Sequence, residues 1–89
     1  MIRKRYVFSG NVQGVGFRYR ARMAARAVGV TGWVRNEYDG TVTLELQGSP
    51  EQLEQVILMI GDGLYVEIRG MEAREVPVIP EERTFVTVH

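Results

Sequence analysis

The segment from Gly10 to Arg18 has residue types that suit the binding of an anion. It reads Gly-Asn-Val-Gln-Gly-Val-Gly-Phe-Arg and joins a β-rich alternating run to an apolar helical stripe. Amides of such a loop and of the first helical turn lack intrahelical partners, and glycines let them approach phosphate oxygens closely. The Arg18 guanidinium matches two phosphoryl oxygens at once. We therefore expect a phosphate-binding loop, although a simple tight turn followed by a solvated arginine has the same pattern.

Two commoner phosphate loops are excluded. A P-loop ends in Gly-Lys-Ser/Thr and is followed by an acidic residue that holds magnesium, and this segment has neither. Gly14 and Gly16 lack the third glycine of the dinucleotide-binding fingerprint, and no parallel βαβ unit follows them. The loop therefore belongs to another class of anion site.

A second polar cluster follows the strand expected over residues 31–36. Asn36 ends this strand and precedes Asp39-Gly40, a dipeptide typical of hairpin turns. Because an amide both donates and accepts hydrogen bonds, Asn36 is a candidate to orient a water molecule. The alternative is a structural cap on the turn. We interpret Trp33, in the same strand, as packing on the sheet and not as a platform for a ligand.

Two amphipathic helices are expected. The first has apolar residues at i, i+3, i+4 and i+7 from Ala21 onward and stops at Gly29. The second opens at Ser49 with a capping box completed by Gln52, and it ends in the glycines of residues 61–63. Both helices need a sheet on which to bury their apolar faces.

Strands are expected over residues 5–9, 31–36, 41–47 and 64–68, and residues 85–88 could add a short closing strand. At Gly70 the alternation loses phase, which indicates a bulge or break, and the stretch from Gly70 to Glu82 matches no expected element. The order β-α-β-β-α-β predicts one α+β domain over residues 1–89: a ferredoxin-like two-layer sandwich with two helices on one face of an antiparallel sheet. This fold hosts unrelated functions, so function has to be argued from the site.

The composition excludes several kinds of chemistry. The chain has no cysteine, and its one histidine, His89, lies at its end, outside the expected site. We therefore expect no metal, no cofactor and a rate nearly independent of pH between about pH 5 and 8, where histidine titrates. No long apolar stretch follows the basic start, so we expect a cytoplasmic protein, active as a monomer, with no membrane partner.

The charges are unevenly distributed along the chain. Eight of the eleven basic residues precede Glu37, the first of the eleven acids. The first third of the chain therefore suits an anionic partner, either a small phosphate or a nucleic acid, unless the acids neutralise it in the fold. The strand expected over residues 41–47 has no aromatic residue for base stacking and contains an acid. We accordingly expect no nucleic-acid partner.

The two polar clusters together resemble the signatures of the acylphosphatase family. The family pattern Gly-x-Val-Gln-Gly-Val-x-Phe-Arg matches Gly10–Arg18, and Gly-Trp-Val-Arg-Asn-x-x-Asp-Gly matches Gly32–Gly40. The similarity extends from about Tyr6 to Gly48, and Asn11 stands where the family commonly has a basic residue. The resemblance implies an enzyme that hydrolyses the carboxyl–phosphate bond of acyl phosphates to a carboxylate and inorganic phosphate.

The resemblance also implies the roles of individual residues. Arg18 and Asn36 are the implied catalytic residues: Arg18 binds the phosphoryl group and Asn36 positions the attacking water. The implied phosphate-binding backbone amides are those of Gln13, Gly14, Val15, Gly16, Phe17 and Arg18. The partner is then a small-molecule acyl phosphate, with inorganic phosphate as product and inhibitor. A domain that binds a phosphate or carbamoyl phosphate without catalysis remains an alternative.

Overall fold

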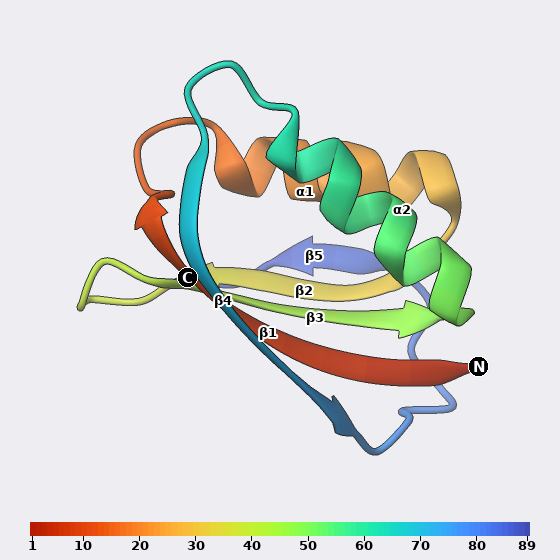
Figure 1. Ribbon diagram of the computed structural model, residues 1–89. Coiled ribbons are helices and arrows are strands. Elements are labelled where there is room, and N and C mark those ends of the chain that lie inside the picture. Colours follow the sequence, from red (N-terminus) through yellow and green to blue (C-terminus); the bar gives the residue numbers. More distant parts are fainter.

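The computed structural model describes all 89 residues, and it places two helices on one face of a five-stranded sheet (Figure 1). The elements are β1 (Ile2–Asn11), α1 (Phe17–Val28), β2 (Thr31–Asn36), β3 (Val42–Gly48), α2 (Pro50–Gly61), β4 (Glu67–Val76) and β5 (Phe85–Thr87). The strands lie side by side in the order β4-β1-β3-β2-β5. The predicted ferredoxin-like α+β fold is confirmed.

One edge of the sheet differs from the prediction. β1 pairs antiparallel with both β3 and β4, and β3 pairs antiparallel with β2. β5, however, pairs in parallel with β2, with Phe85 opposite Gly32. The expectation of a purely antiparallel sheet is wrong here, because the chain leaves β4 at one edge, crosses the sheet and enters β5 at the other edge in the direction of β2 (Figure 1).

The core lies between the sheet and the helices. Sixteen buried hydrophobic residues form it: Tyr6, Phe8, Val12, Phe17, Ala21, Ala24, Ala25, Val30, Val34, Val42, Leu44, Leu46, Leu53, Val56, Ile60 and Phe85. The ring of Phe17 packs 5.0 Å, centroid to centroid, from the ring of Phe8 on β1. The first residue of α1 is therefore fixed against the sheet, which also fixes the direction of the residue that follows it.

The helix boundaries agree with the sequence. α1 ends at Gly29, whose φ of 92° lies in the left-handed region that favours glycine. α2 begins with the expected capping box: the Gln52 N–H donates to the Ser49 hydroxyl at 3.2 Å, and the Ser49 N–H donates to the Gln52 side chain at 2.9 Å. Neither helix combines the length and the apolar composition needed to cross a membrane.

The fourth strand lies further along the chain than predicted. β4 begins at Glu67, and both Leu64 and Tyr65, which we placed in a strand, are exposed outside it. The bulge inferred from Gly70 is confirmed: Gly70 pairs with Ser9 but Ile68 pairs with Gly10, so one residue of β4 is left out of the register. Because β4 is a mostly exposed edge strand, its sequence carries little alternation that could have located it.

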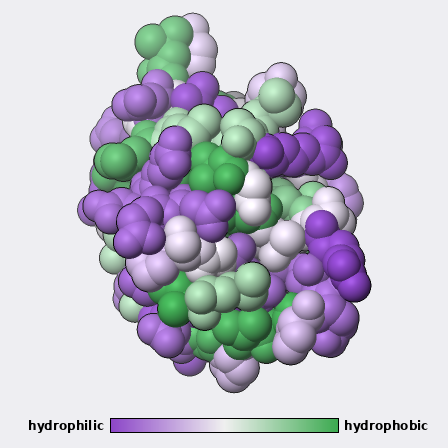
Figure 2. All heavy atoms as spheres, turned by 90° about the vertical axis from the view of Figure 1, so that its right-hand side faces the viewer, coloured by the Kyte–Doolittle hydropathy of each residue, from purple (hydrophilic) through white to green (hydrophobic).

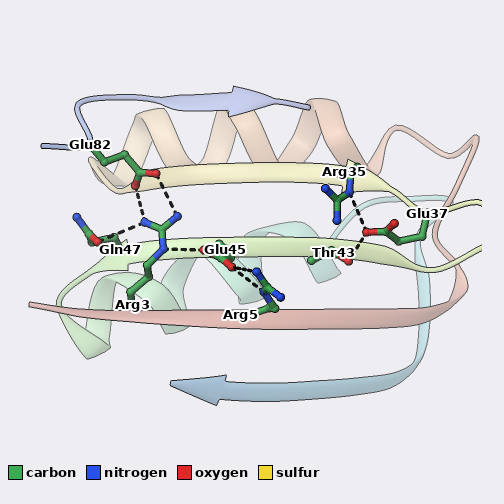
Figure 3. A network of polar contacts seen from close by, with 8 residues as sticks. All are labelled: Arg3, Arg5, Arg35, Glu37, Thr43, Glu45, Gln47 and Glu82. Carbon is green, nitrogen blue, oxygen red and sulfur yellow. Dashed lines mark hydrogen bonds and ion pairs between the residues drawn. The ribbon is translucent and has the colours of Figure 1, made fainter. Parts of the chain in front are cut away.

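The open face of the sheet, away from the helices, carries a network of polar side chains (Figure 3). Arg3 is fully buried there and donates to Glu45 at 2.7 Å and to Glu82 at 2.8 and 3.1 Å. Burial lowers the pKa of the Arg3 guanidinium, but the hydrogen bonds that it donates to Glu82 and Glu45 outweigh this effect and raise the pKa above its ordinary value. This network ties the crossing segment 77–84, for which the sequence predicted no element, to the sheet.

Trp33 lies half-buried on β2, with the guanidiniums of Arg5 and Arg35 5.8 and 5.0 Å from its ring centroid. Its interpretation as packing on the sheet is confirmed.

At the end of the molecule that carries the N-terminus, hydrophobic residues form small groups between hydrophilic ones (Figure 2). The C-terminus lies at the opposite end of the sheet (Figure 1).

Candidate active site

The start of α1 and the ends of β2 and β5 lie at the same end of the sheet (Figure 1). Residues of these segments line a cavity of ≈ 360 Å³. Its lining consists of Val12, Gly14, Gly16, Phe17, Arg18, Tyr19, Arg22, Asn36, Thr87 and His89. The volume falls in the range of about 300–1,000 Å³ that is usual for small-molecule sites. No aspartate or glutamate lines the cavity, which joins the two polar clusters seen in the sequence.

The loop before α1 has free amides. None of the N–H groups from Gln13 to Arg18 donates to a backbone carbonyl, and the first such bond runs from Arg20 N to Gly16 O at 2.9 Å. Gly14 and Gly16 have φ values of 72° and 83°, in the left-handed region, and a Cβ at either position would meet no atom within 4 Å. Glycine is therefore favoured at these two positions because of the left-handed backbone conformation, since a larger side chain would have room there.

Gln13 anchors this loop to the neighbouring hairpin. Its side-chain Nε2 donates to Glu37 O at 2.6 Å and to Thr41 O at 2.9 Å. Neither Gln13 nor Val15 lines the cavity, whereas the other four residues predicted to offer phosphate-binding amides do. The side chain of Gln13 thus connects the loop to the turn that follows Asn36.

Arg18 lies half-buried in the first turn of α1, directly after the fixed ring of Phe17. Its guanidinium makes no hydrogen bond with the protein, and no carboxylate lies within 4.0 Å of it. A half-buried cation without a protein partner is suited to a ligand that brings its own negative charge.

Asn36, the last residue of β2, also lacks a partner. Its Oδ1 is buried and makes no hydrogen bond. The turn is capped instead by Asp39, whose Oδ1 accepts from the amide of Thr41 at 3.0 Å and from its hydroxyl at 2.7 Å. The alternative interpretation of Asn36 as the cap of this turn is therefore wrong, and its amide remains available to the cavity.

The two acids of the hairpin are not suited to take a proton near neutral pH. Hydrogen bonds from the Thr43 hydroxyl and then from Arg35 hold the pKa of the Glu37 carboxyl below its ordinary value. Hydrogen bonds from Thr41 lower the pKa of Asp39 in the same way. The structure also contains no group of three or more histidine, aspartate or glutamate side chains that could hold a metal ion.

Five lining residues were not among the predicted site residues: Val12, Tyr19, Arg22, Thr87 and His89. Arg22 follows Arg18 by four positions, which places both on one face of α1, so the helical spacing could have indicated it. The expectation that His89 lies outside the site is wrong. β5 runs parallel to β2, and the Val88 amide donates to Val34 O at 2.8 Å, so the last residues arrive beside Asn36.

Comparisons with known proteins identify the family of the chain. A model of the acylphosphatase family matches residues 4–87. An acylphosphatase of Bifidobacterium longum is 42% identical over 82 residues, which cover 91% of this chain and 84% of that protein. The crystal structure of acylphosphatase from Bacillus subtilis has a TM-score of 0.91 and 29% identity, and the match covers 100% of both chains. Because these matches extend over nearly all of the sequence and contain both polar clusters, the chain belongs to the acylphosphatase family of hydrolases.

Proposed function

We propose that the cavity is the active site, in which the carboxyl–phosphate bond of an acyl phosphate is cleaved to a carboxylate and inorganic phosphate. One observation carries the proposal. The unpartnered guanidinium of Arg18 and the unpartnered amide of Asn36 line the same acid-free cavity, beside a loop whose amides are free. These groups are the ones that a phosphoryl group and an attacking water require.

Arg18 and the loop amides hold the phosphoryl group. Transfer through a loose transition state spreads negative charge over the three equatorial oxygens, so catalysis consists mostly of positioning and electrostatic stabilisation. The fork of Arg18 offers two parallel donors, and the amides from Gly14 to Arg18 offer further ones. The left-handed glycines give the loop the conformation that keeps these amides out of helical hydrogen bonds.

Asn36 positions the attacking water. Its amide can accept a hydrogen bond from the water and donate another to the substrate, which orients the water without removing its proton. The leaving group is a carboxylate, which needs no general acid. Glu37 and Asp39 lie outside the cavity lining and their pKa values are lowered, so neither carboxylate is suited to accept the proton of the water. We assign this proton to the substrate's own phosphate, which lies beside the water.

Two substitutions test these roles. Arg18→Lys keeps the charge but loses the planar fork, so inhibition by inorganic phosphate should weaken and turnover of acetyl phosphate should fall together. Asn36→Ala should lower kcat by roughly 10²–10³ and weaken phosphate inhibition much less than Arg18→Lys does, because the water is the main partner of Asn36 and the phosphoryl group keeps Arg18 and the loop amides.

Matched controls exist on the surface of the same domain. Arg26→Lys lies on the exposed side of α1, and Gln55→Ala removes an exposed amide side chain from α2. Both should keep the parental rate. If Asn36→Ala stays folded and turns over at the parental rate, the water-positioning role is wrong. A chain that binds phosphate without hydrolysing any acyl phosphate would instead support the alternative of a binding domain.

We further propose that the enzyme acts as a monomer in the cytoplasm on a freely diffusing acyl phosphate. All ten residues of the cavity lining come from one chain, so the site needs no second copy. The chain has no cysteine, so its fold depends on no disulfide and is compatible with a reducing compartment such as the cytoplasm. Light scattering coupled to gel filtration, with activity measured across the peak, tests the monomer.

A further inference from the structure

We propose that Arg22 forms a second anion subsite, which selects acyl phosphates whose acyl group carries a negative charge of its own. This inference rests on the proposed function, because it assumes that the phosphoryl group binds at Arg18. It adds a substrate class: molecules with a phosphoryl group at one end and a carboxylate or second phosphate at the other.

The position of Arg22 relative to Arg18 carries the first part of the argument. The two arginines are four residues apart on α1, and both line the cavity. Side chains at this spacing are neighbours on one helix face, with their Cβ atoms about 5–6 Å apart. When the phosphoryl group is bound at Arg18, the acyl part of the substrate therefore lies within reach of the Arg22 side chain.

The charge of Arg22 is not compensated by the protein. It takes part in none of the five ion pairs of the structure, whereas Arg5 and Arg35 on the open sheet face are each paired with a carboxylate. Its Nε is buried without an acceptor, and its terminal nitrogens make no hydrogen bond with the protein. The guanidinium lies 5.9 Å from the centroid of the Tyr19 ring, which orients it without neutralising its charge. Burying such a donor without an acceptor is unfavourable, so a hydrogen bond from the guanidinium to a ligand oxygen removes this cost and favours binding.

The size and lining of the cavity leave room for such a substrate. At about 30 Å³ for each water-sized group, ≈ 360 Å³ holds about a dozen non-hydrogen atoms, more than acetyl phosphate has. Beyond Arg18 and Asn36 the wall includes Tyr19, Thr87 and His89, each with a hydrogen-bonding group. The cavity therefore carries the guanidiniums of both Arg18 and Arg22 and no aspartate or glutamate side chain, which favours an anionic group over an apolar one beside Arg22.

The test compares two acyl phosphates of similar shape, the monophosphate of fumaric acid and crotonoyl phosphate, which differ in a carboxylate or a methyl group at the far end. The trans double bond prevents the carboxylate from attacking its own anhydride. For the parental enzyme we expect kcat/KM to be roughly tenfold or more higher for the carboxylated substrate, as for a charge-assisted hydrogen bond. Arg22→Gln should bring the ratio close to one while acetyl phosphate is still hydrolysed. Higher ionic strength should reduce the ratio for the parental enzyme.

Two further variants complete the design. Arg26→Gln removes the same charge from the exposed part of α1 and should leave the ratio unchanged, and Arg22→Lys should retain part of it. A parental ratio near one, or a ratio that survives in a folded Arg22→Gln, overturns the inference while leaving the proposed function intact. If acetyl phosphate itself is not hydrolysed by the parental chain, the proposed function fails first.

Discussion

The buried network around Arg3 makes a sharp prediction about stability, with Glu45→Gln as the perturbation. The Glu45 carboxylate accepts from Arg3 at 2.7 Å and from Arg5 at 2.6 Å (Figure 3). Glutamine keeps the shape and one acceptor oxygen but removes the charge. The side chains of Arg3 and Glu45 are 0% and 6% exposed, so water cannot replace the lost partner.

The magnitude follows from what Arg3 keeps. Removing one partner of a buried ion pair costs about 3–5 kcal/mol when the remaining charge has no other partner. Arg3 still has Glu82, whose side chain is 16% exposed, so we expect about 2–3 kcal/mol of lost unfolding free energy. A chain of 89 residues has about 4–13 kcal/mol in total, so the variant should remain folded at 25 °C.

Urea unfolding followed by circular dichroism measures this loss, with Glu67→Gln as the control. Glu67 pairs with Arg69 at 2.8 Å, but both side chains are more than half exposed, and the same substitution there should cost no more than about 0.5 kcal/mol. If the two variants lose equal stability, the reasoning that burial makes the Arg3 network strong is refuted. Acetyl phosphate turnover by folded Glu45→Gln should stay parental, because the network lies outside the cavity lining.

The same variant predicts a change in pH dependence. Burial raises the pKa of the Glu45 carboxyl, but the hydrogen bonds and charges of Arg3 and Arg5 outweigh it and hold the pKa below its ordinary value of 4.5. A lowered folded-state pKa contributes stability above the unfolded value, and this contribution is lost as the pH falls through the folded value. The stability difference between parental protein and Glu45→Gln should therefore be full above about pH 5 and shrink below pH 4.5.

Two further predictions concern the site. Gln13→Ala loses two hydrogen bonds to the hairpin, so we expect about 1–3 kcal/mol less stability in urea unfolding, together with lower turnover and weaker phosphate inhibition. Chelator should leave acetyl phosphate hydrolysis unchanged and phosphomonoesters should react poorly, whereas a rate that collapses and returns with magnesium would overturn the mechanism.

The parts of the fold that were predicted are those with a local signal. The capping box at Ser49, the glycine that ends α1 and the alternation of β3 each depend on neighbours in sequence. β4 was misplaced because most of its residues are exposed, so burial imposes no alternation on them. The parallel pairing of β5 depends on how the segment 77–84 crosses the sheet, and the contacts that hold it, such as Arg3 with Glu82, join residues far apart in sequence.

The residues of the site were likewise predicted where a local sequence pattern existed and missed where their position depends on contacts far apart in sequence. Arg18 and Asn36 were found because each stands within a dense local pattern, and the structure brings both to one cavity. Arg22 was overlooked although its helical spacing from Arg18 was visible. His89 was excluded from the site on its distance in sequence, and nothing near it in the chain indicates that β5 joins β2. The inference of a pH-independent rate therefore rested on a premise that the structure contradicts.

The two sides of the cavity differ in local stability, because one of them is formed by the parallel edge strand β5. On the α1 side, the lining residue Phe17 belongs to the hydrophobic core. On the opposite side, Thr87 is the last residue of β5, a strand of only three residues, and His89 lies beyond it. Phe85, at 1% exposure, holds the start of that strand, and beyond it the Val88 amide bonds to Val34 O. Short edge segments with few buried contacts open at a small fraction of the global unfolding free energy. Opening of the last residues should therefore cost much less free energy than unfolding of the sheet, so the two sides of one cavity differ in local stability although they belong to one small domain.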